Sequence, residues 1–289
     1  MPFTIYSEPA RTILTPTSGF IAEAGFTHSL TPARNCTYGC SYCYVPTMGI
    51  YGGLRPDDVR YWGAHTTFKS NAAPLLERAL RPEQIIYCSP LVDPFQPAEA
   101  ETGIMAPILE VVGRKPPRVF VLQTRSSRIL EYLEALRPLC HRTTLRVSFS
   151  ITTDDDAIRR IYEPQCDPIE RRFDVVQTLL AHGIETYVTL APLLPCDPDH
   201  LLERALHASP NPILCDPLHI RAEKPRGATT REFAHSIAER RGHLHWLDPE
   251  FQRFTVARMA ARAQAAGREF ATGPTAFRFL SAHQSLSLR

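Results

Sequence analysis

The sequence predicts an α/β fold, because short apolar runs alternate with longer stretches in which apolar residues have helical spacing. Runs of strand length lie at residues 84–88, 119–124, 145–151, 186–191 and 212–215. Helical stretches separate them at residues 107–112, 129–136, 174–181 and 201–206. Strands that are apolar throughout and alternate with helices are typical of a parallel sheet that is covered on both faces.

The strand count indicates an open barrel. A further strand at residues 27–30 precedes the series and brings the total to about six βα units, fewer than the eight of a closed TIM barrel. We therefore predict a partial (β/α)6 barrel of the TIM type over residues 26–220. Residues 1–25 would form a short N-terminal arm, and residues 221–289 a helical C-terminal extension. One helix of this extension, at residues 251–266, would pack across the barrel.

The overall composition indicates a globular protein without a strong electrostatic preference. The chain has 289 residues, of which 44% are hydrophobic, and this suffices for a large core. Its 32 Lys and Arg against 30 Asp and Glu give a formal net charge of +2, so its overall field does not steer it to nucleic acid or to a membrane. We see neither a signal peptide nor an apolar stretch of transmembrane length, and therefore expect a soluble cytoplasmic protein.

Three of the eight cysteines form a compact motif, Cys36, Cys40 and Cys43, with the spacing C-x3-C-x2-C. Thiolates bind iron–sulfur clusters well, and a short loop can place three of them around one cluster. Three ligands leave one iron of a cubane open to a small molecule. Gly39 relaxes the backbone between the ligands. The other five cysteines are isolated in the sequence: Cys88, Cys140, Cys166, Cys196 and Cys215.

Two alternatives stay open for this motif. The cysteines could be buried without a ligand, or they could form a structural zinc site. Structural zinc takes four protein ligands, and no histidine follows the trio closely. His65 or a distant cysteine would have to supply the fourth ligand.

The loop, with the aromatic Tyr42 before its last cysteine, resembles the signature of the radical S-adenosylmethionine (SAM) superfamily. Within that superfamily the chain looks like the spore photoproduct lyase-like branch. The likeness extends from about residue 31 to residue 215. Segments that resemble this branch in the same order lie at residues 92–99, 122–126, 150–153, 163–164 and 191–195.

This resemblance implies a [4Fe–4S] cluster held by Cys36, Cys40 and Cys43, with S-adenosyl-L-methionine on the open iron. One electron, from a donor such as flavodoxin or ferredoxin, would cleave SAM to a 5′-deoxyadenosyl radical. The radical would abstract hydrogen from an unidentified substrate. The alternatives are a non-catalytic iron–sulfur or zinc-binding protein, and a nucleic-acid-binding relative without lyase activity.

The resemblance also suggests residues that bind SAM at the carboxyl ends of the strands, where ligands of such sheets lie. Tyr42 would lie near the adenine, and Asp93 would accept from the SAM amine. Thr124 and Arg125 would meet the SAM carboxylate, since a guanidinium offers two parallel hydrogen bonds. In the structural alternatives, Asp93 caps a turn before Pro94, and Arg125 pairs with a surface acid.

Two serines alternate with apolar residues along one predicted strand. Ser148 and Ser150 are separated by Phe149 and follow Val147. Because successive side chains of a strand point to opposite faces, the two hydroxyls should share one face. They would point toward the ribose or carboxylate of SAM, or serve as ordinary polar groups of the barrel interior.

The sequence departs from the lyase pattern at the position of the hydrogen donor. Spore photoproduct lyase uses a nearby cysteine to return hydrogen to a product radical. Cys88 ends the strand before Asp93 and is the candidate for this role, although its spacing to Asp93 does not match. The alternative is a small buried core residue.

Clusters of arginine leave nucleic acid open as a minority interpretation for the substrate. The clusters would have to converge on the barrel mouth to contact phosphates. Helical arginine pairs are more often solvated surface, which we expect here. The basic groups are Arg159–Arg160, Arg171–Arg172, Arg137, His141, Arg142 and Arg146.

Overall fold

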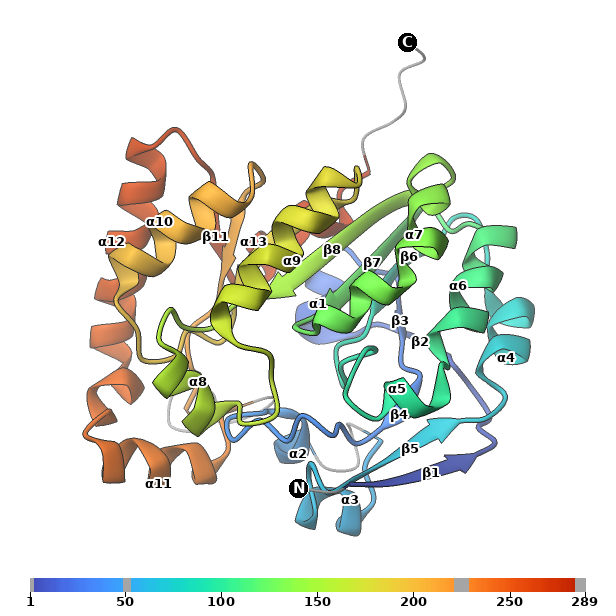
Figure 1. Cartoon of the computed structure of the whole chain (residues 1–289), viewed down its shortest axis with the longest axis horizontal. Coiled ribbons are helices and arrows are strands. Elements are labelled where there is room, and N and C mark those ends of the chain that lie inside the picture. The colour runs from blue at the N-terminus through green and yellow to red at the C-terminus, as the bar shows by residue number, and fades with distance from the viewer. Residues whose placement is uncertain (1–2, 49–52, 221–228, 284–289) are drawn as a thin grey trace.

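The computed structural model describes residues 3–48, 53–220 and 229–283. Its main sheet has eight strands in the order β11-β10-β9-β8-β7-β6-β3-β2, and every neighbouring pair is parallel except β2 with β3. The sheet is open at both edges (Figure 1). Its strands are β2 (Leu14–Pro16), β3 (His28–Leu30), β6 (Ile85–Cys88), β7 (Val119–Thr124), β8 (Thr144–Ser150), β9 (Glu185–Leu190), β10 (Ile213–Cys215) and β11 (Phe270–Thr272).

A second, small sheet lies beside the carboxyl ends of the main strands (Figure 1). It has the order β1-β5-β4, in which β1 is parallel to β5 and β4 is antiparallel to it. The strands are β1 (Thr4–Glu8), β4 (Ala33–Arg34) and β5 (His65–Lys69). Strand β4 ends two residues before Cys36, so its pairing in this sheet fixes the start of the cysteine loop.

Helices connect the strands, and several of them cover the outer face of the main sheet (Figure 1). The helices up to β8 are α1 (Gly19–Glu23), α2 (Val45–Met48), α3 (Pro56–Arg60), α4 (Ala72–Ala79), α5 (Glu99–Thr102), α6 (Met105–Arg114), η2 (Ser127–Tyr132), α7 (Leu133–Leu136) and η3 (Arg137–His141). The later ones are α8 (Asp156–Tyr162), α9 (Ile169–Ala181), α10 (Pro198–Ala208), α11 (Glu232–Arg241), η4 (Leu244–Leu247), α12 (Pro249–Ala265) and α13 (Gly273–Ser281).

Local sequence signals account for several helix ends. The side chains of Asp155, Asp197 and Asp248 accept backbone N–H groups at the starts of α8, α10 and α12. These caps satisfy donors that have no partner inside a helix. Helix α9 ends at Ala181, the last residue of the predicted stretch, and is followed by the cap residue His182 and by Gly183 in the left-handed region at φ 75°.

The two faces of the main strands differ in chemistry. The outer face carries fully buried apolar side chains such as Ile86, Leu122 and Val147, which belong to one hydrophobic cluster with the covering helices. The inner face carries a second cluster, which includes Tyr87 and Val121 and packs against α1 and α13. Helices α1 and α13 therefore fill the amino-terminal half of the concave face, and the carboxyl-terminal half is left for polar groups.

The predicted partial barrel is confirmed: six parallel strands, β3 and β6 to β10, follow one another in sequence and in space. The C-terminal extension adds β11, a strand of three residues that was not predicted from the sequence. The predicted helix at residues 251–266 forms as α12. It packs beside α10 and β11, and the expectation that it crosses the barrel is wrong.

Two further expectations need refinement. The predicted helix at 129–136 is a series of short 3₁₀ and α-helical turns, η2 and α7. The predicted N-terminal arm, residues 1–25, contributes β1 to the small sheet and β2 to the main sheet. The boundaries near residues 25 and 220 stay predictions, and residues 221–228 lie outside the described part. Within the described ranges, none of the helices combines the length and apolar character required to span a membrane.

Candidate functional site

The cysteine loop begins directly after β4, and its conformation depends on Asn35, Gly39 and Gly63. Asn35 is fully buried with φ 65°, and its side-chain oxygen accepts from the backbone N–H of Cys36 at 2.7 Å and of Gly63 at 3.2 Å. Gly39 has φ 58°, and a Cβ there would lie 3.1 Å from the Cα of Gly63. The loop therefore needs glycine at residue 39, both for backbone freedom and for the close approach of Gly63.

The three thiols of the motif are buried together. Cys36 and Cys40 are each 7% exposed, and Cys43 is half-buried. Burial raises the pKa of Cys43 to about 12. The pKa of Cys36 is also raised, first by burial and then by the negative charge of Asp93. The backbone amides of Asp93 and Tyr38 face the Cys36 sulfur and oppose this rise. Three soft thiols with backbone N–H donors at the sulfur fit an iron–sulfur cluster, whose positive irons stabilise the thiolates.

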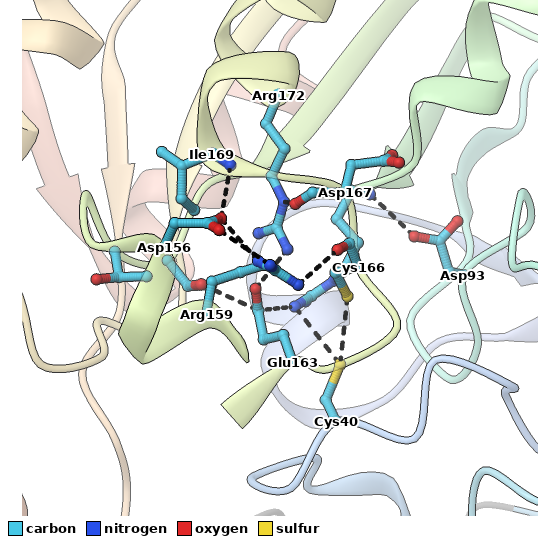
Figure 2. A network of polar contacts seen from close by, with 12 residues as sticks. Cys40, Asp93, Asp156, Arg159, Glu163, Cys166, Asp167, Ile169 and Arg172 are labelled. Atoms are coloured by element: carbon cyan, nitrogen blue, oxygen red, sulfur yellow. Dashed lines mark hydrogen bonds and ion pairs between the residues drawn. The ribbon is translucent and has the colours of Figure 1, made fainter. Parts of the chain in front are cut away.

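A fourth thiol and a carboxylate lie beside Cys40, although they are distant in sequence. The Cys166 sulfur is 4.0 Å from the Cys40 sulfur, and one ligand atom each from Cys40, Glu163 and Cys166 lie within 4.8 Å of one another (Figure 2). Sequence reasoning treated Cys166 as isolated because 126 residues separate it from Cys40. His65, the histidine considered for zinc, bonds to Asp58 at 2.9 Å and is outside this group.

Glu163 is the centre of a buried ionic network. Its Oε1 accepts from Thr152 at 2.9 Å and also from Tyr42 and Arg125, while its Oε2 accepts from Arg172 Nη2 at 2.5 Å. The side chains of Glu163 and Arg172 are 0% exposed. Burial by itself raises the pKa of Glu163, but the two guanidinium groups hold it at about 2. The carboxylate is therefore ionised and positions both arginines. Residues 163–164 belong to the segments that resemble the family, but the sequence predicted no role for Glu163.

Arg125 lies next to both Cys40 and Tyr42. The Arg125 Nη1 is 3.8 Å from the Cys40 sulfur, and its guanidinium lies over the Tyr42 ring at 5.7 Å from the centroid. The Arg125 side chain is 16% exposed. Its pairing partner is the buried Glu163, and the alternative of a surface acid is wrong. The contact of Tyr42 with adenine and that of Arg125 with the SAM carboxylate stay predictions.

Asp93 ties the loop after β6 to the end of β7. Its carboxylate accepts from the backbone N–H of Phe95 at 2.9 Å, from Thr124 Oγ1 at 2.7 Å and from the backbone N–H of Arg125 at 2.9 Å. A carboxylate has about four acceptor positions, so one is left for a ligand donor. The single hydroxyl proton of Thr124 is directed to Asp93, and Thr124 could donate to a ligand only if that bond were broken.

Ser148 and Ser150 share the inner face of β8, which confirms the predicted alternation with Val147 and Phe149 in the outer cluster. The Ser148 hydroxyl lies 2.6 Å from that of Thr189. Ser150 accepts from Gln123 Nε2 at 2.8 Å, and Gln123 in turn accepts from Tyr87 at 2.6 Å. The serines thus belong to a polar layer of the barrel interior, below the cysteine loop, and their contact with SAM stays a prediction.

Cys88 lies apart from this group. It is 0% exposed and belongs to the outer hydrophobic cluster with Ile86, two residues earlier on β6. Tyr87, between them, belongs to the inner cluster. Since alternate side chains of a strand point to opposite faces, the Cys88 thiol points away from the interior. This placement matches the alternative of a small core residue, although the charge of Asp93 adds to burial in raising the pKa of the Cys88 thiol, and the role of hydrogen donor stays a prediction.

The expectation of solvated arginine pairs is wrong for one member of each pair. Arg159 is 7% exposed and binds Asp156 with two hydrogen bonds, while Arg160 is exposed. Arg172 is fully buried against Glu163. Arg146 is also buried, near the amino end of β8. These three buried arginines are structural partners of nearby carboxylates, so they do not form a basic surface at the barrel mouth.

This combination of an open parallel barrel and a cysteine loop at its carboxyl edge agrees with the family comparison. The sequence profile of the Radical SAM superfamily matches residues 30–208, more than half of the chain. The chain belongs to the radical SAM superfamily. Members of this superfamily bind a [4Fe–4S] cluster and SAM, and the cysteine loop described above lies within the matched residues.

Curated relatives share part of the chain and are themselves uncharacterised. A protein of Methanocaldococcus jannaschii is 23% identical over 160 residues, 55% of this chain and 58% of the relative. A protein of Mycobacterium tuberculosis is 22% identical over 178 residues, 60% of this chain and 52% of the relative. A protein of Acidianus two-tailed virus is 26% identical over 195 residues, 65% of this chain and 63% of the relative. The chain thus spans little more than half the length of the first two.

Solved structures of spore photoproduct lyase share the fold. A cysteine-to-serine variant of that enzyme superposes with a TM-score of 0.56 at 15% identity, over 85% of this chain and 80% of that one. A tyrosine-to-phenylalanine variant gives a TM-score of 0.54 at 14% identity, over 74% of this chain and 61% of that one. The likeness confirms the predicted fold.

Proposed function

We propose that this chain is a radical SAM enzyme, in which Cys36, Cys40 and Cys43 hold a [4Fe–4S] cluster and SAM occupies the fourth iron. When bound, the reduced cluster and SAM supply a 5′-deoxyadenosyl radical that abstracts hydrogen from a substrate. An electron donor such as flavodoxin or ferredoxin would reduce the cluster. The substrate is unidentified, and the lyase-like character rests on the branch resemblance.

The single observation that carries this proposal is the position of the three thiols. They lie in one buried loop at the carboxyl edge of six parallel strands, with Arg125 Nη1 at 3.8 Å from one sulfur. Ligands of parallel α/β sheets bind at this edge. A structural zinc loop needs neither the barrel edge nor a buried cation beside the thiolates.

The neighbouring side chains support the binding of SAM in defined ways. The Arg125 guanidinium is held by Glu163 and would pair with the SAM carboxylate, leaving its remaining N–H groups for Tyr42 and Glu163. The carboxylate of Asp93 would accept from the SAM amine. Burial raises the pKa of Asp93, and its three chain donors and Arg125 favour the ionised form. The buried polar side chains beneath, such as Ser148 and Ser150, would help to exclude water from the reaction.

The test is anaerobic SAM cleavage. The protein is reconstituted with iron and sulfide, reduced with dithionite and incubated with SAM, and 5′-deoxyadenosine is quantified by chromatography. We expect about four irons and four sulfides per chain, and 5′-deoxyadenosine that falls to the no-enzyme level in the Cys36→Ala variant. Cys215→Ala, which changes a buried cysteine of the outer cluster, is the matched control and should retain both iron and product.

Two results would contradict the proposal. A protein that takes up zinc and no iron under these conditions is a structural zinc protein. A Cys36→Ala variant that keeps the full cubane refutes the ligand assignment. If SAM is cleaved, the substrate search begins with nucleic acids, because spore photoproduct lyase has been solved with a dinucleoside spore photoproduct.

A further inference from the structure

Cys166 is a buried thiol whose position the cluster assignment leaves unexplained. Its sulfur lies 4.0 Å from that of Cys40, within range of a hydrogen bond between sulfur atoms. A buried cysteine is usually a small apolar core residue, as Cys88 and Cys215 are in the outer cluster. Cys166 differs from them because Glu163 and Cys40 lie within 4.8 Å of its sulfur (Figure 2).

The backbone on which Cys166 lies is fixed by several polar contacts. Its N–H donates to the carbonyl of Glu163 at 3.0 Å, and its carbonyl accepts from Arg159 Nη1 at 3.1 Å. Arg159 is in turn held by both carboxylate oxygens of Asp156, at 2.8 and 3.0 Å. The next residue, Asp167, accepts from the backbone N–H of Ser127 at 2.7 Å. These contacts, drawn in part in Figure 2, hold the loop between α8 and α9 in one position.

The cysteine loop is fastened to the same region. The Ser41 N–H donates to the carbonyl of Tyr162 at the end of α8, at 2.9 Å. Both thiols are thus carried by backbone that is pinned to a common element, so their contact is built into the fold. Close by, Arg172 is 0% exposed, and its Nη1 has no hydrogen-bond partner within the described part of the chain. This buried cation adds positive potential at both sulfurs.

We propose that the Cys166 thiol donates a hydrogen bond to the Cys40 sulfur while Cys40 ligates the cluster, and thereby raises the reduction potential of the cluster. The inference rests on the proposed function. A cluster-bound Cys40 is a thiolate without a proton, so Cys166 is the only one of the two that can donate. Hydrogen bonds to cluster sulfurs stabilise the more negative, reduced state and so raise the potential. Cys166 is therefore a positioning and tuning residue that does not itself contact the reacting atoms.

The test is the potential of the one-electron [4Fe–4S]²⁺/⁺ couple, measured by an EPR-monitored anaerobic titration with dithionite as the electron source. The compared proteins are the wild type, Cys166→Ala, Cys166→Ser and the control Cys196→Ala, which removes a half-buried cysteine outside the site. We expect all four to bind the same amount of iron. Cys166→Ala should have a more negative potential and a smaller reduced fraction at a given dithionite concentration, and Cys166→Ser, which keeps a donor, should recover at least part of the shift.

Three outcomes would overturn the inference, each for a different reason. Equal potentials in the wild type and Cys166→Ala mean that the thiol does not act on the cluster. Loss of iron in Cys166→Ala, with full iron in Cys196→Ala, means that Cys166 is itself a ligand. A wild-type protein that binds no iron refutes the proposed function, and the tuning role with it.

Discussion

Two buried arginines lie at opposite ends of the same barrel and differ in the partners that the chain gives them. Near the amino end of β8, Arg146 binds Glu185 at 3.0 Å and the carbonyls of Leu280 and Ala282 at the end of α13. Near the carboxyl end, Arg172 binds Glu163 and the carbonyl of Asp167.

The two arginines differ in whether a buried nitrogen of the guanidinium lacks a hydrogen-bond partner in the described residues. The Nε and Nη1 groups of Arg146 both have partners in the chain, and these contacts join the last helix to the sheet. Arg172 keeps one buried N–H group without a partner in the described residues, next to two thiols and a second guanidinium. In barrels of this type, the amino end serves stability and the carboxyl end carries the chemistry. The comparison predicts that changes at one end affect the free energy of unfolding alone, and that changes at the other also affect the cluster.

The largest effect is expected for Glu163→Ala. The substitution leaves Arg125 and Arg172 buried without a counter-charge, which should lower the free energy of unfolding by about 3–5 kcal/mol. It should also reduce iron retention, because Arg125 is no longer held beside Cys40. Urea denaturation and iron analysis measure the two effects. A variant that loses stability but binds iron and SAM normally would break the comparison.

The pH dependence of the free energy of unfolding tests the contribution of the Glu163 carboxylate. The pKa of Glu163 is about 2 in the folded protein, below its ordinary value of 4.5. The unfolded chain therefore binds the proton more readily, so the stability that the carboxylate contributes is complete above about pH 4.5 and is lost as the pH falls toward 2. Unfolding free energies measured from about pH 6 to pH 3 should fall less steeply in Glu163→Gln than in the wild type. Equal slopes would show that Glu163 is not the group that titrates.

At the amino end of the barrel, Arg146→Met should lower the free energy of unfolding by about 2 kcal/mol, because the carbonyls of Leu280 and Ala282 lose their donor. Glu185 is 38% exposed and can be solvated, so the penalty is smaller than for Glu163→Ala. Iron content and the dissociation constant for SAM should not change. A loss of cluster in this variant would mean that the two ends are coupled, against the interpretation above.

The smallest effect is expected in the polar layer between the two ends. Ser148→Ala removes the 2.6 Å contact with the Thr189 hydroxyl and should lower the free energy of unfolding by about 1 kcal/mol. Because Ser148 is directed to Thr189, we expect SAM cleavage to stay within about twofold of the wild type, which corresponds to less than 1 kcal/mol in the barrier. A larger fall in 5′-deoxyadenosine would assign Ser148 to SAM binding, as the family resemblance suggests.

Most of the barrel could be predicted from sequence because its signals are local. The strand β7, Val119–Thr124, has the predicted bounds, and β6 and β8 to β10 lie within one or two residues of theirs. The cysteine motif is equally local, since its spacing alone places three thiols in one loop. Strands outside the barrel series were not predicted: β1 and β5 pair with each other in the small sheet, and β11 pairs with β10 at the edge of the main sheet.

What the sequence by itself determined is the parallel α/β architecture, the three cysteines of the loop and the side of the sheet on which they lie. Only the tertiary structure decided which distant groups meet them. From the sequence, Cys166 was an isolated thiol and Arg172 a surface arginine. In the structure Cys166 and Glu163 lie beside Cys40, and Arg172 pairs with Glu163. Cys88, the predicted donor, lies in the outer core. The physical reason is that burial, the pairing of charges and the face of a strand depend on contacts between residues far apart in the chain, which spacing along the sequence does not encode.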